Sequence, residues 1–197
     1  CIFLEETMRG LVPIAGYGVS LIVAGAYERF GTEEQKREML KGICEGRVEA
    51  IAMSEPEAGS DVGNLKCKVE RLDNSAGDVV LNGQKTWISA AHIADHVLVV
   101  ARSDSSGSKH EGLTMVSVPT DAEGIEINGI QTMGGKEVND VFLTDCYVPE
   151  ERGIFASLTV DENLTLPPTV APGVSRPPFG IVRIAAISAA TSESVMN

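Results

Sequence analysis

The spacing of apolar residues changes near residue 49, from a helical period to a period of two. In the first part, one helical stripe ended by Pro13 contains Ile2, Phe3, Leu4, Met8, Leu11 and Val12. Gly31-Thr32-Glu33-Glu34-Gln35 predicts a second helix start with a capping box, and Gly46 lies where that helix should stop. The apolar run 14–27 between them falls short of the roughly 18 residues that a membrane span needs, so it predicts a buried helix.

After Glu49 the sequence is typical of short strands separated by Asn-Gly, Ser-Gly, Glu-Gly and Gly-Gly turns. We expect an antiparallel β domain with a hairpin turn at Asn82-Gly83, because both central residues of a type I′ turn need positive φ. Gly134-Gly135-Lys136 lacks the rest of a phosphate-binding loop and predicts another hairpin turn. The strand-like runs are 79–81, 86–88, 96–101, 113–118, 125–130 and 138–148.

The last segment has a different composition, with few charges and several prolines that interrupt any helix. Only residues 181–190 could form a regular element there. The fold class predicted is therefore α+β: partial N-terminal helical domain at 1–49, β domain at 50–152, and an irregular Pro-rich arm at 153–197.

Composition narrows the possible partners. The net charge is −12, with 16 Lys and Arg against 28 Asp and Glu, which argues against a nucleic acid or an anionic membrane surface. The four cysteines are scattered, and His92, His96 and His110 lack ligand spacing, so no metal site is predicted. Unpaired cysteines favour a reducing, cytoplasmic compartment.

Two polar segments carry the chemistry. The first is 52–61, Ala-Met-Ser-Glu-Pro-Glu-Ala-Gly-Ser-Asp, and the second is 82–89, Asn-Gly-Gln-Lys-Thr-Trp-Ile-Ser. Taken singly, each has an ordinary explanation: a turn whose Ser and Asp bond local backbone, and a tryptophan in a core. A flavin, however, needs hydrogen-bond donors along its ring edge, a cover for its ring face and close backbone approach to its pyrophosphate. The two segments together offer all three.

The paired motifs resemble the flavin-binding part of the acyl-CoA dehydrogenase family, and the resemblance covers roughly residues 1–152. It implies FAD as the cofactor, with contacts from Met53, Ser54, Gly59, Ser60, Trp87, Ile88 and Ser89. Two departures bear on the site. Ala90-Ala91 stands where many members have Asn-Gly, and Glu57 adds a negative charge where Gly is common.

In the family, a carboxylate removes the α proton of an acyl-CoA thioester, a hydride passes from the β carbon to the flavin, and electrons then pass to an electron-transfer flavoprotein. That carboxylate belongs to a C-terminal helical domain that is not recognisable after residue 152, so no catalytic residue is assigned in this chain. Three hypotheses stand: a fragment or misjoined form of an acyl-CoA dehydrogenase, a non-catalytic subunit of a hetero-oligomer, or a related oxidase. A homo- or hetero-oligomer is expected, in the cytoplasm or, in a eukaryote, the mitochondrial matrix.

Overall fold

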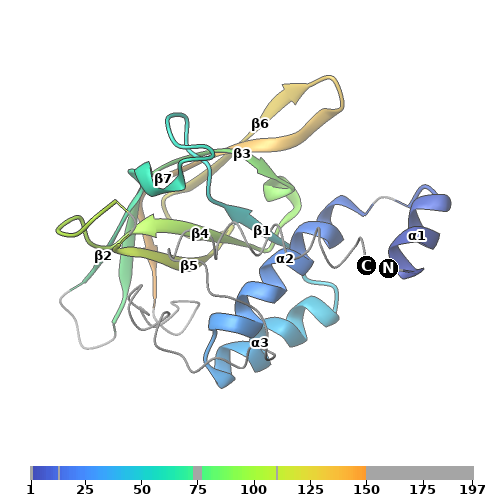
Figure 1. Cartoon of the computed structure of the whole chain (residues 1–197), viewed down its shortest axis with the longest axis horizontal. Coiled ribbons are helices and arrows are strands. Elements are labelled where there is room, and N and C mark those ends of the chain that lie inside the picture. The colour runs from blue at the N-terminus through green and yellow to red at the C-terminus, as the bar shows by residue number, and fades with distance from the viewer. Residues whose placement is uncertain (1, 13, 73–76, 110, 150–197) are drawn as a thin grey trace, which may run out of the picture.

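The computed structural model describes residues 2–12, 14–72, 77–109 and 111–149. Within these residues the chain forms three helices, two short 3-10 helices and a seven-stranded sheet that curls into a half-barrel (Figure 1). The predicted arm at 153–197, including 181–190, lies outside the described residues. The predicted α+β class is confirmed.

The helices are α1 (Ile2–Arg9), α2 (Ala15–Phe30) and α3 (Glu33–Cys44), with the 3-10 helices η1 (Val62–Asn64) and η2 (Ala91–Ile93). The strands are β1 (Glu49–Ala52), β2 (Lys68–Arg71), β3 (Val79–Ser89), β4 (His96–Arg102), β5 (Leu113–Pro119), β6 (Ile125–Thr132) and β7 (Gly135–Val148).

Both ends of α3 follow from local sequence. Thr32 Oγ1 accepts the Gln35 backbone N–H at 3.2 Å, and Gln35 Oε1 accepts the Thr32 N–H at 2.9 Å, which completes the predicted capping box. At the other end Gly46 has φ +104, and its N–H donates to the Ile43 carbonyl at 3.1 Å. Glycine adopts this left-handed conformation without steric penalty, so the predicted stop is also confirmed.

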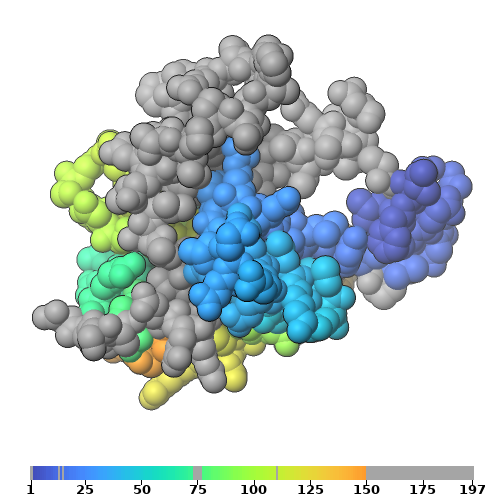
Figure 2. All heavy atoms as spheres, turned by 90° about the horizontal axis from the view of Figure 1, so that it is seen from below, coloured from blue at the N-terminus to red at the C-terminus, as the bar shows by residue number. Residues whose placement is uncertain are grey.

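Helix α1 stands apart from the rest of the molecule in both views (Figures 1 and 2), and none of its described residues is buried. It ends at Arg9, before the end of the predicted apolar stripe, and Leu11 beyond it has φ +51. Helices α2 and α3 instead lie side by side against the sheet. Val23 and Tyr27 of α2 and Met39 of α3 are buried in one cluster with Leu98 of β4.

Strand β4 organises the sheet. It pairs with β5 in antiparallel fashion along its whole length, and its other edge takes β1 and then β2, both parallel to it. The strands β2, β3, β7 and β6 continue the sheet as antiparallel neighbours. The sheet is thus mixed, whereas the sequence predicted an antiparallel domain. Alternation of apolar residues reports which face is buried and carries no information on strand direction.

The predicted hairpin turn at Asn82-Gly83 is wrong. Strand β3 runs straight through these residues, and its register against β7 shifts between Leu81 and Gly83. Gly83 has φ +153, and a Cβ there would lie 2.7 Å from the backbone of Cys67. The glycine therefore serves a bulge and a close approach of the Cys67 backbone, a use that leaves the same sequence signal as a turn. The predicted turn at Gly134-Gly135 is confirmed, since Thr132 of β6 pairs with Gly135 of β7.

Because β4 is buried on both faces, its side chains alternate between the inside of the half-barrel and the opposite face of the sheet. Val97 and Val99 point into the half-barrel, whereas Leu98 points to the helices. A strand covered on both sides reads as a continuous apolar run, as residues 97–101 do.

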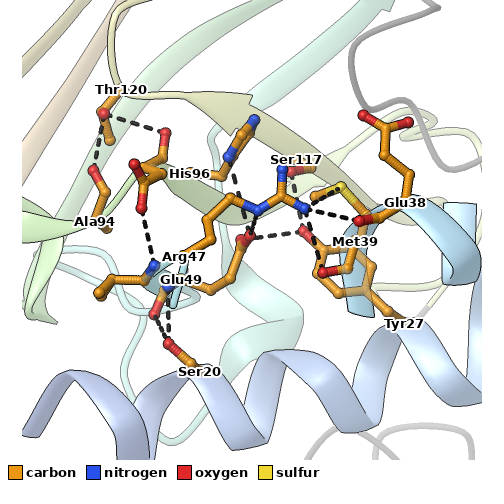
Figure 3. A network of polar contacts seen from close by, with 12 residues as sticks. Ser20, Tyr27, Glu38, Met39, Arg47, Glu49, Ala94, His96, Ser117 and Thr120 are labelled. Atoms are coloured by element: carbon orange, nitrogen blue, oxygen red, sulfur yellow. Dashed lines mark hydrogen bonds and ion pairs between the residues drawn. The ribbon is translucent and has the colours of Figure 1, made fainter. Parts of the chain in front are cut away.

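A polar cluster fastens the helices to the sheet (Figure 3). Glu49 of β1 is fully buried; its N–H donates to Ser20 Oγ at 2.9 Å, and the Tyr27 hydroxyl donates to Glu49 Oε2 at 3.3 Å. The Tyr27 hydroxyl also lies 3.0 Å from Ser117 Oγ, and Arg47 Nε pairs with Glu49 Oε1 at 3.2 Å. These contacts join α2 to β1 and β5 at the centre of the helix–sheet interface.

Charge is disfavoured inside this cluster. Burial raises the pKa of Glu49 to about 7, although Arg47 and the Tyr27 hydroxyl oppose the rise. Burial and then Arg47 lower the pKa of His96, whose Nδ1 lies 3.9 Å from Glu49 Oε1. The folded protein therefore resists ionisation of both the carboxyl and the imidazole.

We expect Glu49→Gln to change the pH dependence of stability. The folded-state pKa of Glu49 is raised from 4.5 to about 7, so the folded protein holds this proton more tightly than the unfolded chain does. The free energy of unfolding should fall as pH rises through that window. Glutamine does not titrate, so the difference in unfolding free energy, variant minus wild type, should grow across the window by up to about 3 kcal/mol. Urea unfolding at stepped pH measures it.

Glu33→Gln is the control for this measurement. Glu33 is exposed, and its hydrogen bond to Lys36 lowers its pKa below 4.5, so its titration lies outside the window. A flat difference for Glu49→Gln across the window would contradict the effect of burial on this carboxyl.

Candidate functional site

The segment between β1 and β2, residues 53–67, fills a gap in the sheet, and we call it the 53–67 loop. Strand β1 pairs with β4 as far as Ala52 and Val99, and β2 joins β4 only at Lys68 and Arg102. Between those points Val100 of β4 packs against Ala58 and Leu65 of the loop. Because the loop replaces a missing stretch of strand, its backbone is held by the sheet on one side and is open on the other.

The two motifs found in the sequence meet at this gap. The Thr86 backbone N–H on β3 donates to the Ser54 carbonyl at 2.9 Å, and Lys85 Nζ donates to the Met53 carbonyl at 3.1 Å. Segments about thirty residues apart in the chain are thereby fixed side by side. Their pairing in sequence has a direct physical counterpart.

A buried ion pair holds the loop to the strand. Lys85 is fully buried, and its Nζ lies 2.8 Å from Glu55 Oε1. The Glu55 carboxylate also accepts the N–H groups of Lys66 at 2.6 Å and Cys67 at 2.9 Å. No role for Lys85 was evident from the sequence; the available signal was its place two residues before Trp87 in the second motif. The pair is structural, because both of its charges are satisfied within the protein.

Trp87 lies on a bulge. The register of β3 against β7 shifts between Lys85 and Ile88, and Trp87 within the shift has φ +61. Its side chain is 61% exposed although tryptophan usually buries most of its surface. A positive φ in a residue with a bulky side chain is strained, and such strain gathers at functional sites. The bulge directs the only tryptophan of the chain outward.

The seven predicted cofactor residues fall into three groups. Met53 and Ser54 are half-buried beside β3, and Ile88 is buried in the core, so that only its backbone could face a ligand. The remaining four, all exposed, are Gly59, Ser60, Trp87 and Ser89. Their role in binding a flavin stays a prediction.

The fold explains why position 83 is a glycine, but it does not explain the glycine at position 59. At Gly83 the fold itself excludes a side chain, as described above. A Cβ at Gly59 would meet nothing within 4 Å, and its φ lies outside the left-handed region. Neither packing nor backbone geometry therefore requires a glycine here, and the exposed backbone at Gly59 leaves room for another molecule to approach it.

Each remaining carboxylate of the 53–67 loop has a cation beside it. Glu57 is exposed and forms a hydrogen-bonded ion pair with Lys66, which lowers the pKa of Glu57. Asp61 pairs with Lys109 at 3.0 Å. The extra charge of Glu57 thus points to solvent and is compensated there.

Arg102 supports the far side of the loop. Its guanidinium donates to the carbonyls of Gly63 at 2.7 Å and Leu65 at 3.3 Å, and to those of Lys109 and Glu111 on the neighbouring turn.

In the part of the chain that the structure describes, no helix is long and apolar enough to cross a membrane.

Comparison with known proteins identifies the family. The model of the acyl-CoA dehydrogenase N-terminal domain matches residues 1–47, and that of the acyl-CoA dehydrogenase middle domain matches residues 50–146. Acyl-CoA dehydrogenase FadE26 of Mycobacterium tuberculosis is 36% identical over 152 residues, covering 75% of this chain and 37% of the relative. The chain belongs to the acyl-CoA dehydrogenase family and spans under two fifths of the length of that relative.

Solved structures agree. One chain of the ChsE4-ChsE5 complex from Mycobacterium tuberculosis superposes with a TM-score of 0.68 at 34% identity, covering 78% of this chain and 39% of the other. A glutaryl-CoA dehydrogenase from Mycobacterium smegmatis in complex with FADH2 superposes with a TM-score of 0.59 at 25% identity, covering 72% and 36%. Helices followed by a curled mixed sheet are the shared architecture.

The described residues fit a flavin in three respects. Trp87 offers a ring on an outward bulge, Ser54 and Ser89 offer hydroxyls that are not buried, and Gly59 leaves backbone open to close approach. These are the apolar cover, the donors and the phosphate approach that the cofactor requires.

We expect Lys85→Met to unfold the protein more readily. The substitution leaves the Glu55 carboxylate buried without its cation, which should lower the free energy of unfolding by about 3–5 kcal/mol. Urea unfolding measures the change. The double variant Lys85→Met with Glu55→Gln should recover part of the loss, since no unpaired charge is then buried.

Lys66→Met is the matched control, because Lys66 pairs with Glu57 in solvent. An exposed pair contributes at most about 1 kcal/mol. Equal losses from Lys85→Met and Lys66→Met would show that the buried pair has no special weight.

Proposed function

We propose that this chain carries the flavin-binding part of an FAD-dependent acyl-CoA dehydrogenase. The reaction is α,β-dehydrogenation of an acyl-CoA thioester, with electrons passed to an electron-transfer flavoprotein. The observation that carries the proposal is the bond from Thr86 N–H to the Ser54 carbonyl, which brings the two motifs together beside the exposed Trp87. When bound, the flavin supplies an acceptor for the hydride.

The residues of this chain bind and orient. Met53 and Ser54 present backbone and hydroxyl from the loop, Gly59 and Ser60 lie where a pyrophosphate can approach the backbone, and Ser89 offers a donor at the strand end. Trp87 covers the ring, and Ile88 contributes backbone alone. Apolar cover excludes water from the ring, which strengthens each hydrogen bond made to it.

The proton-removing base lies outside the 53–67 loop. A general base must reach the proton it takes and must be free to accept it. Glu55 is held by Lys85 and two backbone amides, Glu57 by Lys66 and Asp61 by Lys109. We infer that another part of the complete enzyme, or another subunit, supplies the carboxylate.

A second candidate is a non-catalytic subunit of a hetero-oligomeric dehydrogenase. It is favoured by the solved relative that is itself a two-component complex. In either case the protein works as a homo- or hetero-oligomer in the cytoplasm or, in a eukaryote, the mitochondrial matrix. Native mass measurement separates the two candidates, because the second requires a partner of different mass.

We expect FAD to quench the fluorescence of Trp87, the only tryptophan in the chain. Half-saturation should require more than about 1 µM FAD, because the chain spans 37% of a relative and the ring is enclosed on few sides. Gly59→Val should weaken binding about 10-fold or more with little change in stability, since its new side chain enters open space.

Gly18→Ala is the control, because a Cβ at Gly18 also meets nothing and Gly18 belongs to α2, outside both sequence motifs. Identical titrations for wild type and Gly59→Val would remove Gly59 from the site. Sub-micromolar binding would mean that the site is more complete than proposed.

This chain alone should show no dehydrogenase turnover. Under anaerobic conditions, saturated acyl-CoA substrates of several lengths should leave the absorbance of FAD-loaded chain unchanged. Substrate-dependent bleaching that survives Trp87→Ala and disappears in Glu57→Gln would place the base on the loop and contradict the assignment. Reoxidation by air in a complete enzyme would distinguish an oxidase from a dehydrogenase.

A further inference from the structure

Asn139 is a polar residue in a core position. It lies on β7 in alternation with Val141 and Leu143, and all three side chains are buried in the same direction along the strand. An apolar residue would satisfy that alternation without an amide to desolvate. The amide therefore needs a reason beyond packing.

Its contacts supply one. Asn139 Nδ2 donates to the Ile88 carbonyl at 2.9 Å and lies 3.2 Å from Nδ1 of His92. One side-chain amide thus bonds both ends of the turn 88–92. Asn139 Oδ1, by contrast, has no hydrogen-bond partner within the described residues. Within the described residues, the contacts of the Asn139 amide are therefore made by its Nδ2 atom.

The backbone of this turn is strained at two positions. Trp87 before it has φ +61, and Ala90 within it also has φ +61. Alanine and tryptophan both resist this region, so the turn is strained on each side of the Ile88–Ser89 peptide. Ile88 and Ser89 are the last residues of β3 paired with β7, opposite Asn139 and Val138, and the Asn139 side chain adds a further contact to the Ile88 carbonyl there.

Because a peptide unit is planar and trans, its carbonyl and N–H point in opposite directions. Holding the Ile88 carbonyl toward Asn139 of β7 directs the Ser89 N–H away from β7. The neighbouring Ala90 N–H is occupied, since it donates to the Glu137 carbonyl at 3.0 Å.

We propose that Asn139 is a positioning residue whose side chain, together with the last pairs of the β3–β7 ladder, holds the orientation of the Ile88–Ser89 peptide and so aims the donors of Ser89 at the flavin ring. The ligand in this proposal rests on the proposed function; the peptide geometry does not. Asn139 itself touches neither cofactor nor substrate. It acts through the carbonyl of Ile88.

The test compares Asn139→Leu, which has a similar volume and no donor, with Asn128→Leu on the adjacent strand. Asn128 is exposed and bonds Glu126 Oε1 at 2.9 Å, so it is a matched amide outside the turn. Asn139→Leu should weaken riboflavin binding about 10-fold while leaving ADP binding within about 2-fold, because Ser89 serves the ring and Gly59 the phosphates. Asn128→Leu should change neither. Equal weakening of riboflavin and ADP by Asn139→Leu would indicate a general structural role and overturn the proposal.

A second measurement needs neither a variant nor a ligand. In wild type, nuclear magnetic resonance should detect a scalar coupling across the hydrogen bond between Asn139 Nδ2 and the Ile88 carbonyl carbon, with slow solvent exchange of the Asn139 amide protons. Absence of both overturns the positioning role even if Asn139→Leu does not fold. If wild type binds neither riboflavin nor FAD while the coupling is present, the proposed function fails and the peptide geometry stands.

Discussion

The pair of Lys85 and Glu55 is the interaction on which the candidate site depends. Burying two charges is unfavourable unless each is fully bonded. Here the carboxylate is met by the ammonium and two backbone amides, and the ammonium is met by the carboxylate and the Met53 carbonyl. These bonds join the 53–67 loop to β3 and connect both ends of the loop, at Met53 and at Cys67, through one buried pair.

The sheet makes such a tie necessary. Strands β1 and β2 occupy successive parts of one edge of β4, and the loop crosses the interval between them. Loop backbone in that interval lacks a regular ladder, so side chains must supply bonds that neighbouring strands usually make. Lys85 and Glu55 bond the loop backbone at Met53, Lys66 and Cys67, and Arg102 bonds it at Gly63 and Leu65.

What the sequence could predict follows from the range of the interactions. The capping box at Thr32 and the glycine stop at Gly46 involve neighbours within five residues, and both were predicted. The meeting of the motifs was inferred from a family resemblance, not from periodicity. Asn82-Gly83 was misread because a hairpin turn and a bulge both require glycine, and only the partner strand distinguishes them.

The residues that were missed have partners far along the chain. Glu49 depends on Tyr27 and Ser20, and Asn139 depends on Ile88, contacts that span 22 to 51 residues. In the sequence each looks like a polar residue interrupting a strand pattern. That interruption was the available signal, since a buried polar residue in a strand requires a partner, but the sequence alone does not say which distant residue is that partner.

The same contacts suit this part of the protein to the ligand-binding role proposed above and not to proton transfer. A residue that orients must keep its hydrogen bonds, whereas a general base must exchange one during each turnover. Glu55, Glu57 and Asp61 are all committed to cations or backbone amides, and releasing Glu55 in particular would loosen the loop that forms the site. Rigid binding and proton removal are therefore best placed on different segments, and the 53–67 loop has the bonding pattern of the first.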